Sequence, residues 1–260
     1  MISQHPTAVI HPKADLDTDV RVGAYSVIGA GVQIGAGTEI SSHVVIEGPC
    51  VIGRSCRLFP FAAIGQIPQD LKFRGERSDL IIGDNNVFRE FVTFHRGTEG
   101  GGKKTVIGND NFFMAYAHVA HDCHIGNDVI MANAATLAGH VTVDDHSFVG
   151  AFSGIHQFCR VGKYGFIGGY SVITKDVLPY SKTVGDRSNV RCYGINSVGL
   201  RRKSFPPEKI RLLRSCFRLL LRSKLNTTQA IEAIENELPP SEEIAYLIDF
   251  IKTSSRGIIK

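Results

Sequence analysis

Residues 119–137 read VAHDCHIGNDVIMANAATL, in which Val119, Ile125, Met131 and Leu137 are spaced six residues apart. An amphipathic helix repeats its apolar residues about every 3.6 positions and a half-buried strand every two, so the spacing indicates neither. A repeat of six is typical of a flat-sided parallel β-helix, in which each hexad supplies one short strand and one corner. Three hexads then complete a coil of about 18 residues, and successive coils stack about 4.8 Å apart.

The same spacing extends in both directions from this stretch. It continues to Ile173 on one side, and on the other it includes Phe113, Ile107, Phe94, Phe88, Ile82 and ten aliphatic residues from Ile64 back to Ile10. The residue four positions after the apolar one is often small, and in four hexads it is a cysteine: Cys50, Cys56, Cys123 and Cys159. We predict that these cysteines fill the core, because the six cysteines of the chain form no CxxC pair.

Two polar stretches interrupt the repeat and predict loops that leave the coil. They are QIPQDLKFRGERSD at 66–79 and TEGGGKKT at 98–105. Loops on a rigid scaffold often carry functional residues, and the candidates here are Gln69, Asp70, Lys72 and Lys103. The alternative is that both are tolerated surface insertions.

The repeat ends near Pro179, and a helical segment follows an irregular link. Pro206 and Pro207 suit a helix start, and the apolar face of that helix would carry Ile210, Leu213, Phe217 and Leu220. Two shorter helices are expected after it, with Thr227 and Ser241 as their N-caps. We therefore predict a β-helix domain at residues 1–190 and a helical domain at residues 191–260.

Charge and hydropathy limit the functions that the chain can have. Residues 200–260 contain 12 Lys+Arg and 7 Asp+Glu, so the net charge of +4 originates in this segment. Such a surface could dock an acidic protein. The aromatic interleaving of nucleic-acid modules is missing, so we expect no nucleic-acid partner. The sequence lacks a signal-peptide pattern and an 18-residue apolar run, which predicts a cytoplasmic protein without stable membrane insertion.

Histidines cluster in hexads that lie one coil apart. The hexads that begin at residues 119, 137 and 155 must stack on one face, and they carry His121, Asp122, Gly139, His140, His156 and Gln157. If the second loop adds seven residues to its coil, His95 joins the same rib. A histidine can act as a general base near neutral pH, and a carboxylate such as Asp122 would orient it, provided that the pair lies at a corner. A zinc site is the alternative use of such imidazoles, although we expect no metal; imidazoles that merely stack along exposed corners are the other alternative.

The motifs AYAHVAHDCHIGN, TFHRGT, GHVTVDDHSFVG, IHQF, QDLK, GLRRK and SSRG together resemble the acyl-carrier-protein:UDP-N-acetylglucosamine O-acyltransferase family over essentially the whole chain. The resemblance implies a left-handed parallel β-helix and a homotrimer. It also implies the first step of lipid A synthesis, in which the 3-hydroxyl of UDP-N-acetylglucosamine attacks the thioester of a (3R)-hydroxyacyl carrier protein. The donor brings its own phosphopantetheine, so no further cofactor is expected.

The resemblance also assigns roles to residues. His121 would be the general base, Asp122 would orient it, and the N–H of Gly139 would stabilise the oxyanion. Contacts to the nucleotide sugar or the acyl donor are implied for Lys72, His95, His118, His140, His156, Gln157, Asn196 and Arg202, the last of which suits a phosphate. Gly169 matches the position that limits acyl length, and its lack of a side chain implies a long hydroxyacyl group.

Two departures leave the acceptor sugar open. Val198 stands where the family often has a Glu before the GL(K/R)R motif, and the link RSNVRCYG is longer than usual. A UDP-diamino sugar is therefore an alternative acceptor. The related N-acyltransferase family carries an N-terminal uridine-binding domain, for which the repeat, starting by Ile10, is expected to leave no room. A non-catalytic scaffold is the remaining alternative.

Overall fold

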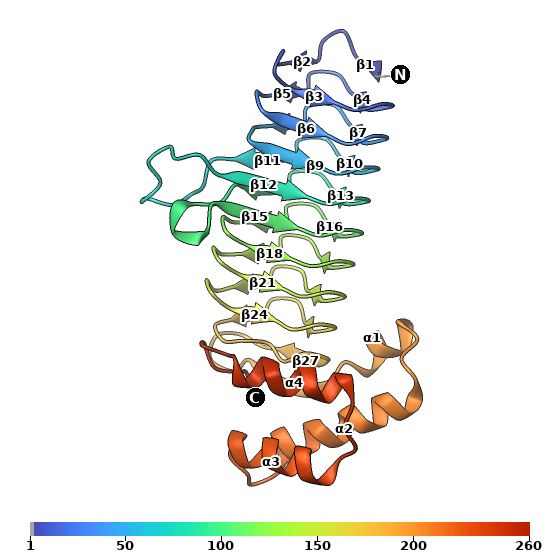
Figure 1. The fold of residues 1–260 in the computed structure, drawn as a ribbon, viewed down its shortest axis with the longest axis vertical. Helices are drawn as coiled ribbons and strands as arrows, with labels where there is room; N and C mark the ends of the chain where they lie inside the picture. Colours follow the sequence, from blue (N-terminus) through green and yellow to red (C-terminus); the bar gives the residue numbers. More distant parts are fainter. Residues whose placement is uncertain (1–2) are drawn as a thin grey trace.

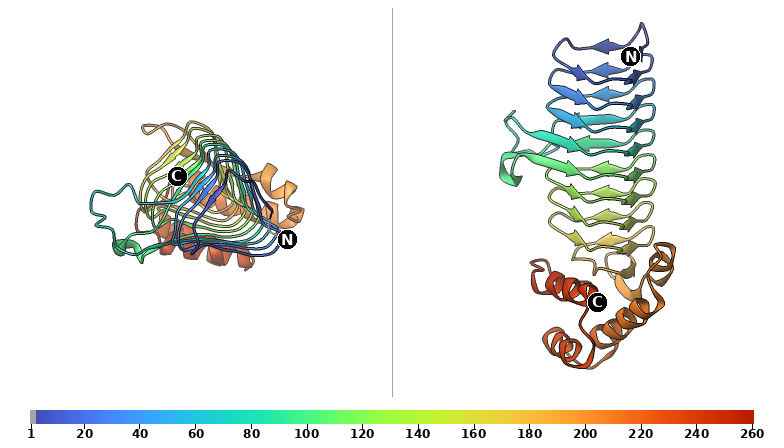
Figure 2. Two further views of the ribbon diagram at one scale, coloured as in Figure 1. Left: turned by 90° about the horizontal axis from the view of Figure 1, so that it is seen from above. Right: turned by 45° about the vertical axis from the view of Figure 1, so that its right-hand side comes forward.

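The chain forms a three-sided parallel β-helix whose C-terminal end is covered by helices (Figure 1). The computed structural model describes residues 3–260. Seen along its axis, the coil has a triangular cross-section (Figure 2). Along the coil the strands pair in parallel with the strands one coil later, as where Val9 lies opposite Val27, so the period of 18 residues is confirmed outside the two loops. The left-handed sense of the coil stays a prediction from the resemblance.

The three faces are sheets A, B and C, which the chain visits in that order. Sheet A contains β1 (Ser3–Gln4), β4 (Arg21–Val22), β7 (Glu39–Ile40), β10 (Arg57–Leu58), β13 (Val87–Phe88), β16 (Phe112–Phe113), β19 (Ile130–Met131), β22 (Phe148–Val149), β25 (Phe166–Ile167), β27 (Ser181–Val184) and β28 (Arg191–Ile195). Sheet B contains β2 (Val9–Ile10), β5 (Val27–Ile28), β8 (Val45–Ile46), β11 (Ala63–Gln66), β14 (Thr93–His95), β17 (His118–Val119), β20 (Thr136–Leu137), β23 (Gly154–Ile155) and β26 (Val172–Ile173). Sheet C contains β3 (Asp15–Leu16), β6 (Val32–Ile34), β9 (Cys50–Ile52), β12 (Asp79–Ile82), β15 (Lys104–Ile107), β18 (His124–Ile125), β21 (Thr142–Val143) and β24 (Arg160–Val161).

The apolar residue of each hexad points into the core. From Val22 onward the side chains of this column are buried, and three phenylalanines, Phe88, Phe94 and Phe113, pack against one another where the coil carries its loops. All six cysteines are buried and free, and the four predicted core fillers belong to the same cluster. Burial raises the pKa of Cys123 to about 12, which keeps this thiol protonated and unreactive.

Both interruptions leave the coil at the corner between sheets B and C, called here the B–C corner. Across the first, Ala63 lies opposite Thr93, 30 residues later, and across the second, Thr93 lies opposite His118, 25 residues later. The second loop thus adds seven residues, as expected, and contains the short 3-10 helix η1 (Glu99–Gly101). The register recovers after each loop, so the loops project from one edge of an otherwise regular prism (Figure 2).

The segment expected to be an irregular link is ordered, and that expectation is wrong. β28 turns back antiparallel to β27, so sheet A extends beyond residue 190. Helix α1 (Ser197–Arg202) follows, with Asn196 as its N-cap. The domain division at residues 190/191 stays a prediction.

Three longer helices cover the end of the coil. Helix α2 (Pro207–Arg222) starts where the two prolines predict, α3 spans Thr227–Glu237 and α4 spans Glu242–Lys252. Ser241 caps α4 as expected, but the cap of α3 is Asn226 and not Thr227. The Asn226 side chain accepts from the backbone N–H of Gln229, whose side chain in turn accepts from the N–H of Asn226, a reciprocal capping box.

The helices bury their apolar faces on each other and on the last turns of the coil. Cys216, Phe217 and Leu220 of α2 pack with residues of α3 and α4 and with Leu178 and Cys192. This arrangement covers the open end of the β-helix core, which would otherwise expose apolar side chains to water.

Stability should depend on the buried column. Leu137 is fully buried between Val119 and Ile155 in sheet B. Leu137→Ala should lower the free energy of unfolding by about 2–5 kcal/mol, because it removes buried methyl groups and leaves a cavity. Thr136→Ala, at the exposed neighbour, should change it by about 0.5 kcal/mol or less. Denaturant unfolding followed by circular dichroism measures both, and equal losses would contradict this packing.

Candidate active site

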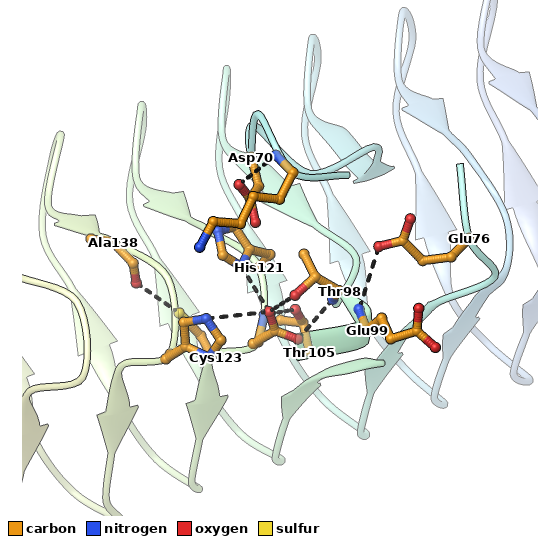
Figure 3. Close-up of polar contacts among 11 residues, drawn as sticks. Asp70, Glu76, Thr98, Glu99, Thr105, His121, Cys123 and Ala138 are labelled. Atoms are coloured by element: carbon orange, nitrogen blue, oxygen red, sulfur yellow. Dashed lines mark hydrogen bonds and ion pairs between the residues drawn. The ribbon is translucent and has the colours of Figure 1, made fainter. Parts of the chain in front are cut away.

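His121 and Asp122 occupy the B–C corner between β17 and β18. Neighbouring residues of a strand point in opposite directions, but Asp122 has a left-handed backbone with φ 60°. This turn brings its carboxylate beside the His121 ring, and Nδ1 of His121 lies 2.7 Å from Oδ2 of Asp122 (Figure 3). The sequence-predicted pair is therefore formed, at a corner as its geometry requires.

The Asp122 carboxylate is buried but well supplied with donors. Its side chain has no exposed surface. The backbone N–H of Thr98 donates to Oδ1 at 2.8 Å, and the Thr98 hydroxyl donates to Oδ2 at 2.6 Å. Burial raises the pKa of Asp122, yet the hydrogen bonds from His121 and Thr98 outweigh burial, so the pKa lies below its ordinary value. The Asp122 carboxylate is thus ionised at neutral pH. It keeps a proton on Nδ1 of His121, which donates to it.

His140 lies one coil further on, in the same corner. Its Nε2 is 3.7 Å from Oδ2 of Asp122, its ring meets the His121 ring edge to face, and it stacks on Phe158 with centroids 4.4 Å apart. Burial lowers the pKa of His140, although the charge of Asp122 opposes this. The neutral form is therefore favoured, and its ring is fixed by packing.

His95 and His118 extend the histidine cluster along sheet B. Their ring centroids are 4.9 Å apart, and Nδ1 of His118 lies 2.7 Å from the Thr93 hydroxyl. Burial and the neighbouring imidazoles lower the pKa of His95 to about 4. His95 therefore stays neutral at physiological pH and can offer or accept a hydrogen bond without adding charge.

Gly139 leaves the space that the His121 ring occupies. A Cβ atom at residue 139 would lie 2.5 Å from Cε1 and 2.8 Å from Nε2 of His121, closer than any side chain permits. Within residues 3–260, the backbone N–H of Gly139 has no hydrogen-bond acceptor. It is therefore free to donate to a charge that develops close to His121 Nε2.

The two loops close a cavity of about 660 Å³ over this corner. The first loop contributes Asp70, Lys72 and Arg74, the second contributes Thr98, and the coil contributes His140 and Phe158. Lys72 is thus brought to the site as predicted. Lys103 instead forms an ion pair with Glu99, 3.0 Å away, and is not part of the cavity lining.

His156 and Gln157 lie at the same corner but further along the axis. Both are exposed, and His156 Nδ1 is 3.2 Å from a guanidinium nitrogen of Arg256 near the C-terminus. The prediction of histidines on one rib is confirmed at the level of the corner. His95, the last residue of β14, and His156, the residue after β23, occupy the first corner position after the buried aliphatic or aromatic residue. His121 occupies the second position and His140 the third, so the histidines do not form a single column.

The other predicted residues lie elsewhere on the molecule. Gly169 is at the corner between sheets A and B, next to Ala151. Asn196 and Arg202 line a second cavity of about 560 Å³ beside α1 and sheet A. That cavity also contains His146, whose Nδ1 lies 2.7 Å from Asp128. In one chain, therefore, the candidate residues belong to separate surfaces.

A metal could in principle use the first of these surfaces. Among residues 3–260, ligand atoms of His121, Asp122 and His140 lie within 4.8 Å of one another. However, the 2.7 Å between Nδ1 and Oδ2 is the distance of a shared proton, whereas two ligands on one zinc at about 2.1 Å would lie further apart. Hydrogen bonding accounts for the cluster, and the expectation of no metal stays a prediction.

Sequence reasoning missed the residues that hold Asp122 in place. Thr98 ends the motif TFHRGT and Thr105 ends the stretch TEGGGKKT, whose insertion of seven residues into its coil the spacing predicts. What the sequence lacked was the direction in which the loop folds. Arg256 belongs to the motif SSRG, and the spacing does not predict its contact with His156.

None of the helices within residues 3–260 has the length and the apolar character needed to cross a membrane.

Known proteins resemble the chain over its whole length. Residues 176–259 match the family model described as UDP N-acetylglucosamine O-acyltransferase, domain 2, and residues 14–48 and 104–139 match the bacterial transferase hexapeptide repeat. Acyl-(acyl-carrier-protein)–UDP-N-acetylglucosamine O-acyltransferase of Thermodesulfovibrio yellowstonii is 49% identical over 256 residues, covering 98% of each chain. The Myxococcus xanthus protein of the same name is 46% identical over 260 residues, covering all of both chains. The solved structure of LpxA from Acinetobacter baumannii superposes with a TM-score of 0.95 at 44% identity, covering 99% of each chain.

Gly139→Ala tests the packing of the candidate base. The added methyl group must displace the His121 ring, so activity should fall by about 100-fold or more while the fold is retained. Gly154→Ala, one coil further on, adds a methyl group that meets no atom within 4 Å and should retain activity. Steady-state rates measure the activity of both variants, and circular dichroism shows whether they fold. A Gly139→Ala enzyme with unimpaired activity would contradict this geometry.

Proposed function

The chain belongs to the acyl-carrier-protein–UDP-N-acetylglucosamine O-acyltransferase family, and from this premise we propose that the B–C corner is where it transfers a (3R)-hydroxyacyl group to the 3-hydroxyl of UDP-N-acetylglucosamine. This is the first step of lipid A synthesis. The observation that carries the proposal is the hydrogen-bonded pair of His121 and Asp122 beside the free N–H of Gly139. His140, which contacts both His121 and Asp122, also lines the cavity that the two loops cover.

His121 is the general base in this proposal. Its Nδ1 is engaged by Asp122, which leaves Nε2 for the proton of the sugar hydroxyl. The ionised carboxylate stabilises the imidazolium that forms. This is the role that a buried, hydrogen-bonded carboxylate performs beside a catalytic histidine in acyl-transfer enzymes.

The remaining steps use the backbone N–H of Gly139 and the proton that His121 has accepted. The sugar oxygen forms a bond to the thioester carbon, and the carbonyl oxygen becomes an oxyanion that accepts from the N–H of Gly139. The intermediate then expels the pantetheine thiolate, which takes the proton from the His121 imidazolium, so that protons balance. Oxyanion donors of this kind contribute about 10²–10³-fold in rate.

Substrate contacts follow from the cavity walls. Lys72 and His140 line the cavity: Lys72 is a cation that suits a phosphate, and burial favours the neutral form of His140, which suits a sugar hydroxyl. His95 and His118 lie beside the cavity on sheet B, and burial likewise favours their neutral forms, which suit sugar hydroxyls or the acyl donor. His156 and Gln157 would extend this surface. No prosthetic group is required in this reaction.

A homotrimer would unite the separate surfaces. The corner between sheets A and B carries stacked, exposed rings of Tyr25, His43, Phe61, Phe91 and Tyr116, which a second copy would cover. Gly169 lies on this same corner and could limit the acyl chain of a neighbouring site. Asn196 and Arg202, in their own cavity, would bind the nucleotide. A trimer in which this corner of one copy faces the B–C corner of the next would bring these residues into one site, and a cytoplasmic location fits the proposed reaction.

His121→Ala distinguishes an enzyme that uses His121 as its base from a non-catalytic scaffold. Wild type should form acyl-sugar from UDP-N-acetylglucosamine and hydroxyacyl carrier protein, and the variant should lose about 10²–10⁴-fold in kcat because its base is gone. His124→Ala, at an exposed histidine of β18, is the matched control and should remain active. Mass spectrometry of products identifies the acyl-sugar.

The same assay identifies the acceptor sugar when the 3-amino analogue of UDP-N-acetylglucosamine is added. Preference for the analogue would favour the diamino sugar, for which Val198 in the second cavity is the supporting feature. Absence of product from both sugars would sink the acyltransferase assignment. Full activity in His121→Ala would sink the proposed base.

The carrier protein should dock on α2. Arg211, Arg214 and Arg218 are exposed on one face of this helix, and within the described residues none has an ion-pair partner. Reversing all three to Glu should raise KM for the acidic acyl carrier protein by about tenfold or more, with KM for the sugar unchanged. Arg57→Glu, on β10, is the control. Unchanged KM for the carrier protein would contradict docking here.

A further inference from the structure

The second loop folds onto the corner that follows it and wraps the Asp122 carboxylate. Thr98, at the start of the loop, binds both carboxylate oxygens, through its N–H and its hydroxyl. The hydroxyl of Thr105, in β15 just after the loop, accepts the backbone N–H of Asp122 at 2.8 Å. Both ends of the insertion are therefore attached to one residue (Figure 3).

The middle of the loop packs on the same carboxylate. A Cβ atom at Gly101 would lie 2.0 Å from Cγ of Asp122, whereas one at Gly100 would meet no atom within 4 Å. His140 and Phe158 hold the equivalent corner position in the next two coils, which carry no insertion. The side chains of His140 and Phe158 are partly exposed to solvent, whereas the side chain of Asp122 has no exposed surface. The loop is thus what removes Asp122 from water.

Removing a carboxylate from water is costly unless donors replace the water. The loop supplies two of the three donors that Asp122 receives, and His121 supplies the third. With Oδ2 shared between the Thr98 hydroxyl and Nδ1 of His121, the position of the carboxylate is fixed from two sides. A water-exposed carboxylate would instead rotate and exchange its partners.

Resting on the proposed function, we propose that Thr98 is a positioning residue of the reaction, acting through Asp122 to hold His121 in its base-competent orientation. The seven-residue insertion is then part of the catalytic apparatus and not a tolerated surface loop. Thr98 does not meet the substrate in this role. Its effect should appear in kcat and in the pH profile more than in KM.

The direct test compares Thr98→Val with Thr98→Ser. Valine keeps the shape and the backbone N–H but removes the hydroxyl donor, so kcat should fall by about tenfold or more with KM for UDP-N-acetylglucosamine little changed. Serine restores the hydroxyl and should restore kcat to within about twofold. Failure of serine to rescue would overturn the proposal.

The pH profile separates positioning from a merely structural role. The hydroxyl donates to the charged form of Asp122, so its removal leaves more of that charge to stabilise the His121 imidazolium, the form that cannot act as the base. The acid limb of kcat/KM should therefore move to higher pH in Thr98→Val and stay in place in Thr98→Ser. An unmoved limb with near wild-type kcat would overturn the proposal.

A double-mutant cycle identifies the residue through which Thr98 acts. Adding Thr98→Val to Asp122→Asn should cost about twofold or less beyond Asp122→Asn alone, because the shared pathway is already broken. If the kcat losses of the two single variants multiplied in the double variant, the proposal would be overturned. Wild type without any acyl-sugar product would instead refute the proposed function, so the two failures are distinguishable.

The glycine pair tests the loop without touching a hydrogen bond. Gly101→Ala must push the loop off Asp122 and should lose about as much kcat as Thr98→Val, with the same shift of the acid limb. Gly100→Ala, in the adjacent residue, measures what an extra methyl group in this loop costs by itself. Thermal unfolding of all variants identifies any that fail to fold. Equal kcat for the two alanine variants would overturn the proposal.

Discussion

Parallel hydrogen bonding between each strand and the strand one coil later holds the molecule in register. Most strands contain only two residues, so none would be stable alone, and each depends on its neighbours above and below and on the apolar residue that it buries. A shift by one residue would turn every aliphatic residue outward. Because this register is fixed along the whole axis, residues far apart in sequence meet at defined heights on a corner.

The candidate site uses that register together with the left-handed turn of each corner. The turn at Asp122 brings its carboxylate beside His121, the next coil brings Gly139 under the His121 ring, and the loops extend from the preceding coils over both. Insertions of different lengths are tolerated because each leaves and rejoins the coil at the same corner. The rigid prism thus positions the base, while the loops exclude water and supply donors.

Much of this arrangement could be predicted from spacing. The apolar column, the buried cysteines, the coil length and the convergence of His95, His121 and His140 all follow from counting residues, because the repeat is nearly unbroken. Side-chain contacts made by the loops do not follow from counting. Thr98 reaches Asp122 only because the loop folds back, and Asn226 rather than Thr227 caps α3 because its side chain reaches the third N–H of the helix. To predict that Gly169 and Asn196 lie away from the histidines, each residue must also be assigned to one of the three corners or faces.

The most direct measurement of the central claim is a crystal structure of the protein with UDP-N-acetylglucosamine. If the B–C corner is the acyl-transfer site, the sugar 3-hydroxyl oxygen should lie about 2.6–3.2 Å from Nε2 of His121, with the carboxylate of Asp122 still on Nδ1. A sugar bound with its 3-hydroxyl away from His121, or bound only in the cavity of Asn196 without reaching any B–C corner of the assembly, would contradict the account.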